Sequence, residues 1–518
     1  MRTRALAVDS RIIIGRAWIV TRRLVLGVAF CLALPAAASN GYYLHGFSAA
    51  QRGMGGASTA LSGEAAQLPL NPAGIVGVGE QWNADLNLIF VSNITRIGER
   101  GPESTAGVFN IEPGAQRSKG DFFLLPFLAY ARAIDDDSAW GLSLNGGGLN
   151  TEYVGGASSF ADGVPALNAR CQGSFGGGAP VPGTLDPAGF CGRGNPVTLA
   201  DFVQVYVRGG YARRFGDSFS LGISPIVVLE YFKASGLSAF DRYSVEPGRV
   251  SDQGHPHSPS LGFGGRFGLL WSPYTGTTLG ASYQTRMRVS RFEQYTGLVL
   301  GGGRLDSPET WNLGLAWHPG RAHLLAVDFE RTNFSEIPVV GQRFDAQRFA
   351  TGCVLPQLLL GAEPSDACVG GSNGPGFGWR DTLSYKFGYR VLPAPNLALS
   401  LGYTWTRRPV SSSQALFNIL APGVTQDHYA AGLSWRLRPQ LSFNIAGLYS
   451  PRRGVKGHNP LSNIDPSVLL APSSAQTQGE LFGVDPQDQT VNVSQQVIEM
   501  IVGLQFGHVV EPCLARIG

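Results

Sequence analysis

Histidines, serines and carboxylates would build a hydrolytic site, and this sequence keeps them apart. Its eight histidines are scattered singly, except for His255 and His257 on either side of one proline. These two side chains could share a metal ion, but a solvated loop is the simpler interpretation. We expect no Gly-x-Ser-x-Gly nucleophile elbow. A hydrolase therefore stays a minor alternative, and the sequence predicts no enzyme, metal or cofactor.

Cysteines are the other reactive residues, and their spacing suits disulfides. Cys171 and Cys191 lie in one Gly/Pro-rich stretch, and Cys353 and Cys368 lie in another. In an exported protein each pair would close a loop of roughly 15–20 residues and stabilise it by about 3 kcal/mol. No zinc-binding spacing is present. Cys513 is left over.

Alternating apolar and polar residues form the elements that must position these groups. Residues 82–90 are apolar at every second position, and the face 123–131 that follows carries Phe123, Leu125 and Phe127. Fourteen segments show this alternation, which predicts fourteen antiparallel strands with lipid-facing apolar sides and a polar lumen. The segments are 82–90, 123–131, 140–144, 203–211, 221–229, 263–271, 279–289, 311–317, 325–329, 383–389, 397–405, 433–437, 441–449 and 498–506.

Composition supports a transmembrane β-barrel. Only 15% of the 518 residues are charged, against the quarter or so that is usual in soluble domains, and 70 are glycine. The net charge of +3 and the lack of a basic run give no indication of a nucleic-acid partner. The apolar run Leu24–Ala38 follows two arginines and ends in alanines. It is too short for a transmembrane helix and is typical of a signal peptide, here residues 1–38.

The connections between the predicted strands alternate between short and long. Short turns include Gly216-Asp217 and Arg438-Pro439, whereas the intervening segments, such as 154–200 and 335–378, are long. Short periplasmic turns and long outer loops are typical of outer-membrane barrels. This alternation places the residues before the first strand, 39–80, and a tail, 507–518, on the periplasmic side.

Residues 39–80 resemble the N-terminal region of the FadL-type outer-membrane transporters of long-chain fatty acids and other hydrophobic compounds, which include aromatic-hydrocarbon channels. Later motifs extend the resemblance over residues 81–506. The motifs are Asn40-Gly41-Tyr42, His45-Gly46-Phe47, Gly53-Met54-Gly55-Gly56-Ala57, Asn71-Pro72-Ala73, Thr151-Glu152-Tyr153, Val327-Asp328-Phe329 and Trp379-Arg380-Asp381.

The resemblance implies a hatch, residues 39–80, that plugs the lumen of the barrel. Hydrophobic cargo would pass from outer loops to an apolar pocket beside the hatch, and then sideways into the membrane at a kinked third strand. The implied gate residues are Asn71, Pro72, Ala73, Gly146, Gly147 and Gly148. Three glycines weaken strand pairing and permit a kink, although a strand that simply ends there would also fit.

The resemblance also suggests ligand contacts. Hatch residues would touch the cargo or pack against the barrel wall, and a lumen cation would hold a carboxylate. The candidates are Tyr42, Tyr43, Leu44, Phe47, Met54, Arg208 and Arg286. We expect a monomer that takes up hydrophobic molecules such as long-chain fatty acids and contacts outer-membrane lipid and lipopolysaccharide. Aromatic hydrocarbons are the alternative cargo, and an outer-membrane lipase or an adhesin is less favoured.

Overall fold

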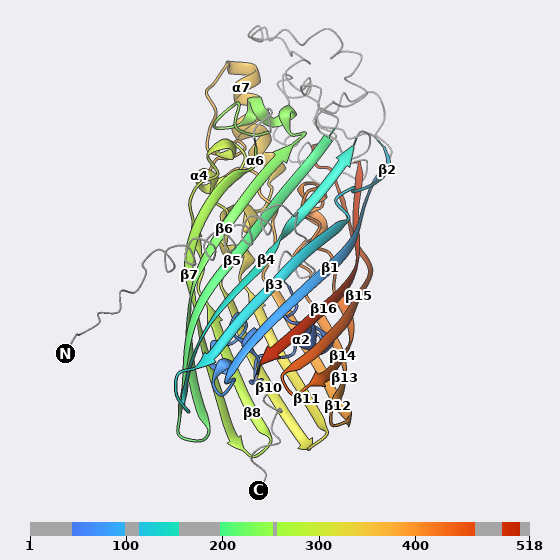
Figure 1. Ribbon diagram of the computed structural model, residues 1–518. Helices are drawn as coiled ribbons and strands as arrows, with labels where there is room; N and C mark the ends of the chain where they lie inside the picture. Colours follow the sequence, from blue (N-terminus) through green and yellow to red (C-terminus); the bar gives the residue numbers. More distant parts are fainter. Residues whose placement is uncertain (1–43, 99–112, 155–196, 252–255, 462–488, 508–518) are drawn as a thin grey trace, which may run out of the picture. The chain divides into compact units, whose positions relative to one another are not determined.

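A computed structural model describes residues 44–98, 113–154, 197–251, 256–461 and 489–507. Fourteen long strands form one closed antiparallel barrel in which each strand pairs with its neighbours in sequence (Figure 1). The last strand closes the barrel on the first, from the pair Gln81–Gly507 to the pair Ile97–Val491. The barrel strands are β1 (Glu80–Ile97), β3 (Phe122–Ala133), β4 (Ser138–Val154), β5 (Val197–Phe215), β6 (Phe219–Ser235), β7 (Ser258–Tyr274), β8 (Thr277–Gln284), β10 (Thr310–Gly320), β11 (His323–Thr332), β12 (Thr382–Ala394), β13 (Leu397–Thr406), β14 (Asp427–Arg438), β15 (Leu441–His458) and β16 (Thr490–Gly507).

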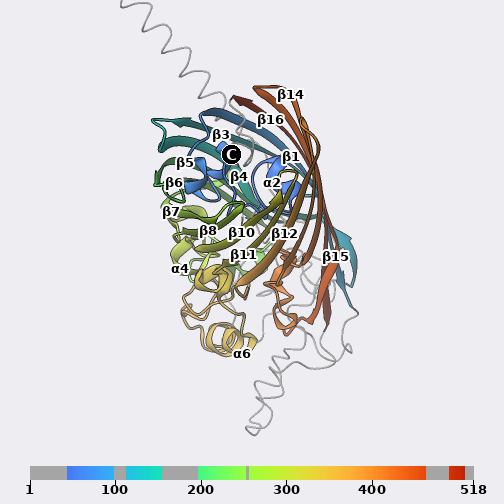
Figure 2. The same cartoon turned by 90° about the horizontal axis from the view of Figure 1, so that it is seen from below.

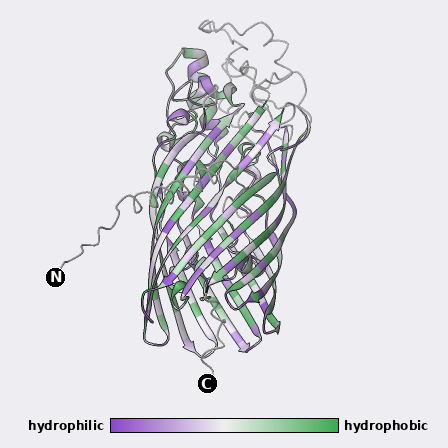
Figure 3. Cartoon of the chain, viewed as in Figure 1, coloured by the Kyte–Doolittle hydropathy of each residue, from purple (hydrophilic) through white to green (hydrophobic). Residues whose placement is uncertain are grey.

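The predicted fourteen-stranded barrel is thus confirmed, and two short strands add to it. β2 (Gly114–Arg117) pairs with the upper part of β1, and β9 (Arg288–Val289) pairs with β7. Alternation sets the two faces of most strands: on β1, Trp82 and Phe90 are exposed while Asp85 is buried. Apolar and polar residues accordingly alternate along the ribbons (Figure 3).

Some of the predicted lipid-facing sides were wrong. Met287 and Val289 of the segment 279–289 are 0% and 5% exposed, and β3 is the clearest case. Phe123, Leu125 and Phe127 of β3 were expected to face lipid, but each is at most 4% exposed, whereas Leu128 on the opposite face is 45% exposed. The face 123–131 looks into the barrel, where the Phe127 ring lies 5.8 Å from that of Phe47. β3 is apolar on both faces because its inner side packs against the N-terminal residues.

The two ends of the barrel differ. At one end, turns of two to four residues join the strands, such as 134–137 between β3 and β4 and 439–440 between β14 and β15. At the other end, the connections are long and carry the helices α4 (Leu300–Gly303), α6 (Ala346–Phe349) and α7 (Leu355–Leu360) (Figure 1). No described helix is long and apolar enough to cross a membrane.

The N-terminal segment, residues 44–79, lies inside the barrel near the short-turn end. It contains three short helices, α2 (Ala49–Gly53), η1 (Ala65–Gln67) and η2 (Pro72–Ile75). Figure 2 shows α2 within the ring of strands. Its backbone approaches the wall closely: a Cβ on Gly53 would lie 2.8 Å from the Cα of Gly432 on β14. Glycine is therefore needed on both sides of this contact.

The long connections fold into a compact cap with an apolar core. Buried aromatic residues such as Phe240, Phe292, Phe334 and Phe349 belong to one cluster that continues into the upper barrel. The cap helices are η4 (Ser238–Tyr243), η5 (Glu293–Tyr295), α4 (Leu300–Gly303), η6 (Phe334–Glu336), α5 (Pro338–Gly341), α6 (Ala346–Phe349), η7 (Ala350–Val354), α7 (Leu355–Leu360), η8 (Ser412–Gln414) and η9 (Phe417–Ile419).

Candidate functional site

An apolar cavity lies between the cap and the upper ends of β4, β5 and β6; we call it the cap cavity. It contains about 1000 Å³ of space, part of which is open to solvent. Leu149, Phe202 and Phe232 line it from the strands, and Trp379 and Phe417 line it from the cap. No charged side chain is among the described residues that line it. Burial here would take an apolar ligand out of water, at about 25 cal/mol per Å² of apolar surface.

Polar groups at the cap cavity are already hydrogen-bonded to the protein. The indole N–H of Trp379 donates to Asn418 Oδ1 at 2.6 Å. The Asn418 amide donates in turn to the carbonyls of Phe377 and Gln414, at 2.8 and 2.6 Å. Because these groups satisfy one another, the lining presents mainly hydrocarbon to a ligand.

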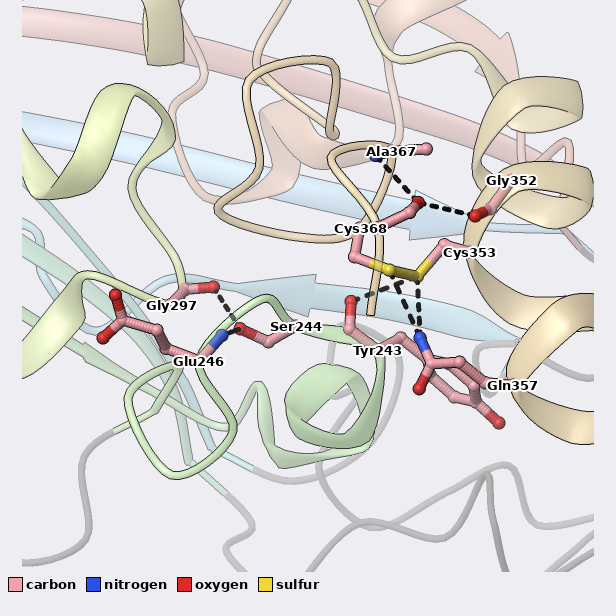
Figure 4. The surroundings of a disulfide bond; sticks show 10 residues. Tyr243, Ser244, Glu246, Gly297, Gly352, Cys353, Gln357, Ala367 and Cys368 are labelled. Atoms are coloured by element: carbon pink, nitrogen blue, oxygen red, sulfur yellow. Dashed lines mark hydrogen bonds between the residues drawn. A yellow bond between two sulfur atoms is a disulfide. The ribbon is translucent and has the colours of Figure 1, made fainter. Parts of the chain in front are cut away.

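A disulfide between Cys353 and Cys368 fixes the part of the cap that carries Val369, another residue of the cap cavity (Figure 4). The Gln357 amide lies 3.2 Å from each sulfur, and Val369 exchanges backbone hydrogen bonds with Tyr243 and Val245. Cys171 and Cys191, which were expected to form a second disulfide, lie outside the described residues.

Replacing both Cys353 and Cys368 with serine is expected to loosen the cap without opening the barrel. A loop of 15 residues is closed by the bond, which is worth about 3 kcal/mol in the chain-entropy model. Hydrogen exchange should accelerate in residues 346–371 and stay unchanged in β12 and β15. Reductant should reproduce the effect in the parent protein and have none on the double variant. Equal exchange in oxidised parent and variant would contradict this role.

A second cavity lies deeper, beside the N-terminal segment; we call it the lumen cavity. It contains about 580 Å³ of space and is lined by Leu44 and Phe47 of that segment and by Gly146 and Gly147 of β4. Leu149 lines the cap cavity and Gly147, two residues away, lines the lumen cavity. At about 3.3 Å per strand residue, the two cavities follow one another along β4.

Three cations and one carboxylate line the lumen cavity, and each cation contacts protein groups. Lys386 pairs with Glu330 at 2.9 Å. Arg266 donates to the carbonyls of Pro69 and Leu70, which holds the N-terminal segment against β7. Arg208 donates to Asn145 Oδ1, and its guanidinium lies over the ring of Phe47 at 5.7 Å. The lumen cavity is therefore polar and carries an excess of positive charge.

Beyond Asn145, β4 is paired with a neighbouring strand on one side only. It pairs with β5 without a break from Ser138 to Val154, but with β3 only from Ala139 to Asn145. The next backbone hydrogen bond toward the β3 side runs from Lys119 N–H to the Glu152 carbonyl, at 2.7 Å. Residues 120–126 therefore face residues 146–151 without strand pairing. We call this segment the β3–β4 interruption.

Local sequence explains the β3–β4 interruption. Pro126 has no N–H and stands opposite Gly146 in the extended register, so β3 cannot donate there. Gly148 has φ +136°, and a Cβ there would lie 1.9 Å from the carbonyl oxygen of Phe202. Only glycine tolerates that conformation and that contact. The lumen cavity reaches the interruption at Gly146 and Gly147.

The N-terminal segment is fixed to the wall by buried polar contacts. The backbone N–H groups of Ser58 and Thr59 both donate to Asp328 Oδ2 at 2.8 Å, and that of Ala49 donates to Asp85 Oδ1. The Asn71 amide bridges the carbonyls of Thr59 and Leu269, at 2.8 and 3.0 Å. These bonds satisfy backbone groups that have no strand partner.

Charged and titratable groups of the segment are buried as well. Arg52 forms an ion pair with Glu499 of β16, and both side chains are 1% exposed. The His45 ring lies 4.2 Å from that of His428 on β14. Burial lowers the pKa of His45 well below its ordinary value, and His428, Lys386 and Arg52 add to this effect. His45 is therefore neutral at neutral pH.

Replacing Glu499 with leucine is expected to release the N-terminal segment. The Arg52 charge would remain buried without its carboxylate, which costs about 3–5 kcal/mol. Protease cleavage within residues 44–60 of detergent-purified protein should accelerate. The double variant Arg52→Met, Glu499→Leu should recover most of the protection because no buried charge is left. Equal cleavage of the single and double variants would argue against the ion pair as the cause.

The structure brings together only some of the residues that were predicted to contact the cargo or to form the gate. Leu44, Phe47, Arg208, Gly146 and Gly147 all line the lumen cavity. Tyr42 and Tyr43 lie outside the described residues.

Other predicted residues lie elsewhere. Met54 is fully buried against Gly388 of β12 and lines none of the described cavities. Arg286 pairs with Asp306 at 2.7 Å. Asn71, Pro72 and Ala73 pack against Gly222 and Gly268, on β6 and β7. A Cβ at Gly146 or Gly148 would instead meet Leu125 or Phe202, so the two sets of implied gate residues have different neighbours.

Sequence reasoning missed most of the cap cavity. Its cap residues lie in irregular connections without a strand or helix period, so only their apolar character could have marked them. It also passed over a Gly-x-Ser-x-Gly run, Gly370–Gly374. That run forms turns in which Gly371 and Asn373 donate to the carbonyls of Cys368 and Asp366. It is not a strand-to-helix elbow of the hydrolase kind.

Comparison with known proteins identifies solved structures that share this architecture. No protein-family model matches the chain, and no curated protein matches its sequence. Among solved structures it is similar to the P. putida toluene transporter TodX, with 15% identity, 90% of this chain and 100% of the other covered, and a TM-score of 0.55. A Pseudomonas aeruginosa FadL homologue gives 15% identity, 90% and 99% coverage and a TM-score of 0.56.

The Ralstonia pickettii toluene transporter TbuX is also similar, with 14% identity, 90% and 99% coverage and a TM-score of 0.51. At these identities the likeness shows a common fold. The chain folds as a FadL-type barrel, the architecture that these toluene transporters and the FadL homologue share.

Proposed function

We propose that this protein is an outer-membrane channel for the uptake of small uncharged hydrophobic molecules, such as aromatic hydrocarbons. The observation that carries the proposal is the cap cavity, whose described lining holds apolar and aromatic side chains and no charge. A water-filled pore would offer such a solute no favourable environment, whereas this cavity removes it from water. The solved structures of the same fold include toluene transporters.

The route has two further steps. From the cap cavity the solute enters the lumen cavity along β4 and β5. It then leaves sideways through the β3–β4 interruption into the hydrocarbon of the membrane, and so bypasses the polar head groups. The N-terminal segment acts as the hatch of the barrel and closes the direct path to the periplasm. The anchoring of Ser58, Thr59 and Asn71 supports a hatch that stays in place during transport.

Long-chain fatty acids are the second candidate cargo, and the excess of positive charge in the lumen cavity favours them. A tail in the cap cavity would place a carboxylate toward Arg208 or Lys386. Two observations weigh against this assignment: Lys386 already has Glu330 as its ion-pair partner, and Arg208 donates to Asn145. We therefore rank uncharged cargo first.

Uptake measurements separate the two candidates. Cells that make the protein, cells that lack it and cells that make a variant without residues 39–79 would be given labelled toluene or labelled oleate. Uncharged cargo predicts faster toluene uptake only with the intact protein, and little change for oleate. Faster oleate uptake alone would favour the fatty-acid assignment. Identical uptake with and without the protein would refute the transport function.

A further inference from the structure

Four basic side chains form a patch on the outward face of the barrel, near the long-loop end. Arg452 and Lys456 come from β15, Arg96 comes from β1, and Arg117 comes from β2. We call these residues the basic cluster. Arg96 and Lys456 are exposed, and the Arg117 side chain is 61% exposed. The patch thus lies on the surface that would meet lipid.

Strand register places the members of the basic cluster close together. Lys456 pairs with Asn492 of β16, which pairs with Arg96, so Lys456 and Arg96 lie two strands apart in one row. Neighbouring strands are about 4.8 Å apart, which puts the Cα atoms of this row within about 10 Å. Arg117 pairs with Ile94, diagonal to Arg96. The charges of Arg96 and Arg117 both act on the Arg452 guanidinium.

The Arg452 guanidinium is held across the junction where the barrel closes. It donates to Ser92 O at 3.1 Å and Ser92 Oγ at 2.8 Å on β1, and to Gln496 Oε1 at 3.3 Å on β16. All of these partners are neutral. With a further bond to Ser494 Oγ at 3.4 Å, the four terminal N–H groups are engaged and the Nε–H is left for another acceptor, while the positive charge stays fixed in place.

The basic cluster begins where the apolar band ends. On β16 the outward residues are apolar from Phe506 to Ile498 and polar from Gln496 to Asn492. Ile498 pairs with Phe90 on β1 and with Tyr449 on β15, so the border is level across the three strands. Arg452 contacts the first polar row, and Arg96 and Lys456 lie two rows above it. In an outer membrane whose hydrocarbon covers the apolar band, the lipid head groups would lie at this height.

Arg331 and Arg453, which are also exposed and lie near the long-loop ends of their strands, are neutralised by the protein. Arg331 of β11 pairs with Asp381 at 2.9 Å, and Arg453 of β15 pairs with Asp427 at 2.7 Å. Among the described residues, the basic cluster has one such contact, Arg117 with Asp121 at 3.9 Å. Glu152 lies on β4, which is separated from β1 by β3. The basic cluster therefore keeps a local excess of positive charge that an anion would relieve.

We propose that the basic cluster binds the phosphate groups of the phosphorylated glycolipid in the outer leaflet of the outer membrane. Phosphate oxygens accept paired N–H bonds from guanidinium groups, and the acyl chains would lie on the apolar band around Phe90 and Ile498. This inference rests on the proposed outer-membrane location and is independent of the cargo.

Lipid binding to the purified full-length barrel tests the proposal. Native mass spectrometry would count bound lipid A bisphosphate, its phosphate-free form and phosphatidylglycerol, with inorganic phosphate as a competitor. The variants are Arg96→Gln alone and Arg96→Gln with Arg452→Gln; Arg331→Gln is the matched control, because it removes an arginine that has a carboxylate partner. A heat-shifted gel mobility would verify folding, and the single variant covers the case in which the double variant does not fold.

We expect the bisphosphate to bind the parent and Arg331→Gln equally. Its affinity should fall at least about tenfold in the double variant and several-fold in Arg96→Gln, while inorganic phosphate competes weakly. Equal retention in all variants, equal binding of the phosphate-free lipid, or equal binding of phosphatidylglycerol would each overturn the proposal. Hydrocarbon uptake by the folded variants should match that of the parent. A failure of the proposed transport function would therefore leave the lipid result standing, and the reverse also holds.

Discussion

Replacing Gly146 with tryptophan is expected to lower toluene uptake at least about tenfold while leaving the barrel folded. Gly146 lies at the first unpaired position of the β3–β4 interruption and lines the lumen cavity. A Cβ there would already lie 3.1 Å from Leu125 Cδ2. An indole would therefore fill the space between the two strands and close the lateral exit, and about 1.4 kcal/mol added to the exit barrier is enough for a tenfold effect.

The matched control is Gly209→Trp on the neighbouring strand β5. Gly209 pairs with Leu142 of β4 and lines none of the described cavities, and the nearest atoms to a Cβ there are 3.9 Å away. That variant should transport at the parent rate. Capture of toluene by detergent-purified protein should be unchanged in both variants, because the cap cavity is untouched. Unimpaired uptake by folded Gly146→Trp would exclude the interruption as the exit.

The barrel could be predicted from the sequence because the alternation of apolar and polar residues is local and recurs in strand after strand. Each strand alternates at a period of two, and the apolar side must meet lipid wherever the other side meets polar groups. β3 shows the limit of this rule: both of its faces are apolar, since Phe127 packs on Phe47 of the N-terminal segment. Alternation alone cannot tell which of two apolar faces points inward.

Only part of the candidate site could be predicted from the sequence. The glycines at 146–148 and Leu44 and Phe47 of the N-terminal segment could be singled out, and the lumen cavity brings most of them together. The wall partners of residues 71–73 were not predictable, because Pro72 meets Gly222 and Asn71 meets Gly268 only through the three-dimensional closure of the barrel. The cap cavity depends on contacts between connections far apart in sequence, such as the 4.8 Å ring contact of Phe344 with Phe417.

Replacing Phe417 with aspartate is expected to abolish capture of uncharged cargo, whereas Phe417→Leu should retain it. Phe417 lines the cap cavity and is only partly buried, so the barrel and most of the cap should fold with either residue. A ligand in the cavity would force the new carboxylate to lose water without a partner, at a cost of at least about 2 kcal/mol, or about thirtyfold in affinity. Leucine keeps the lining apolar and loses only the ring contacts with Phe240 and Phe344. Binding of labelled toluene to purified protein measures the difference, and equal affinities for the two variants would place the capture site elsewhere.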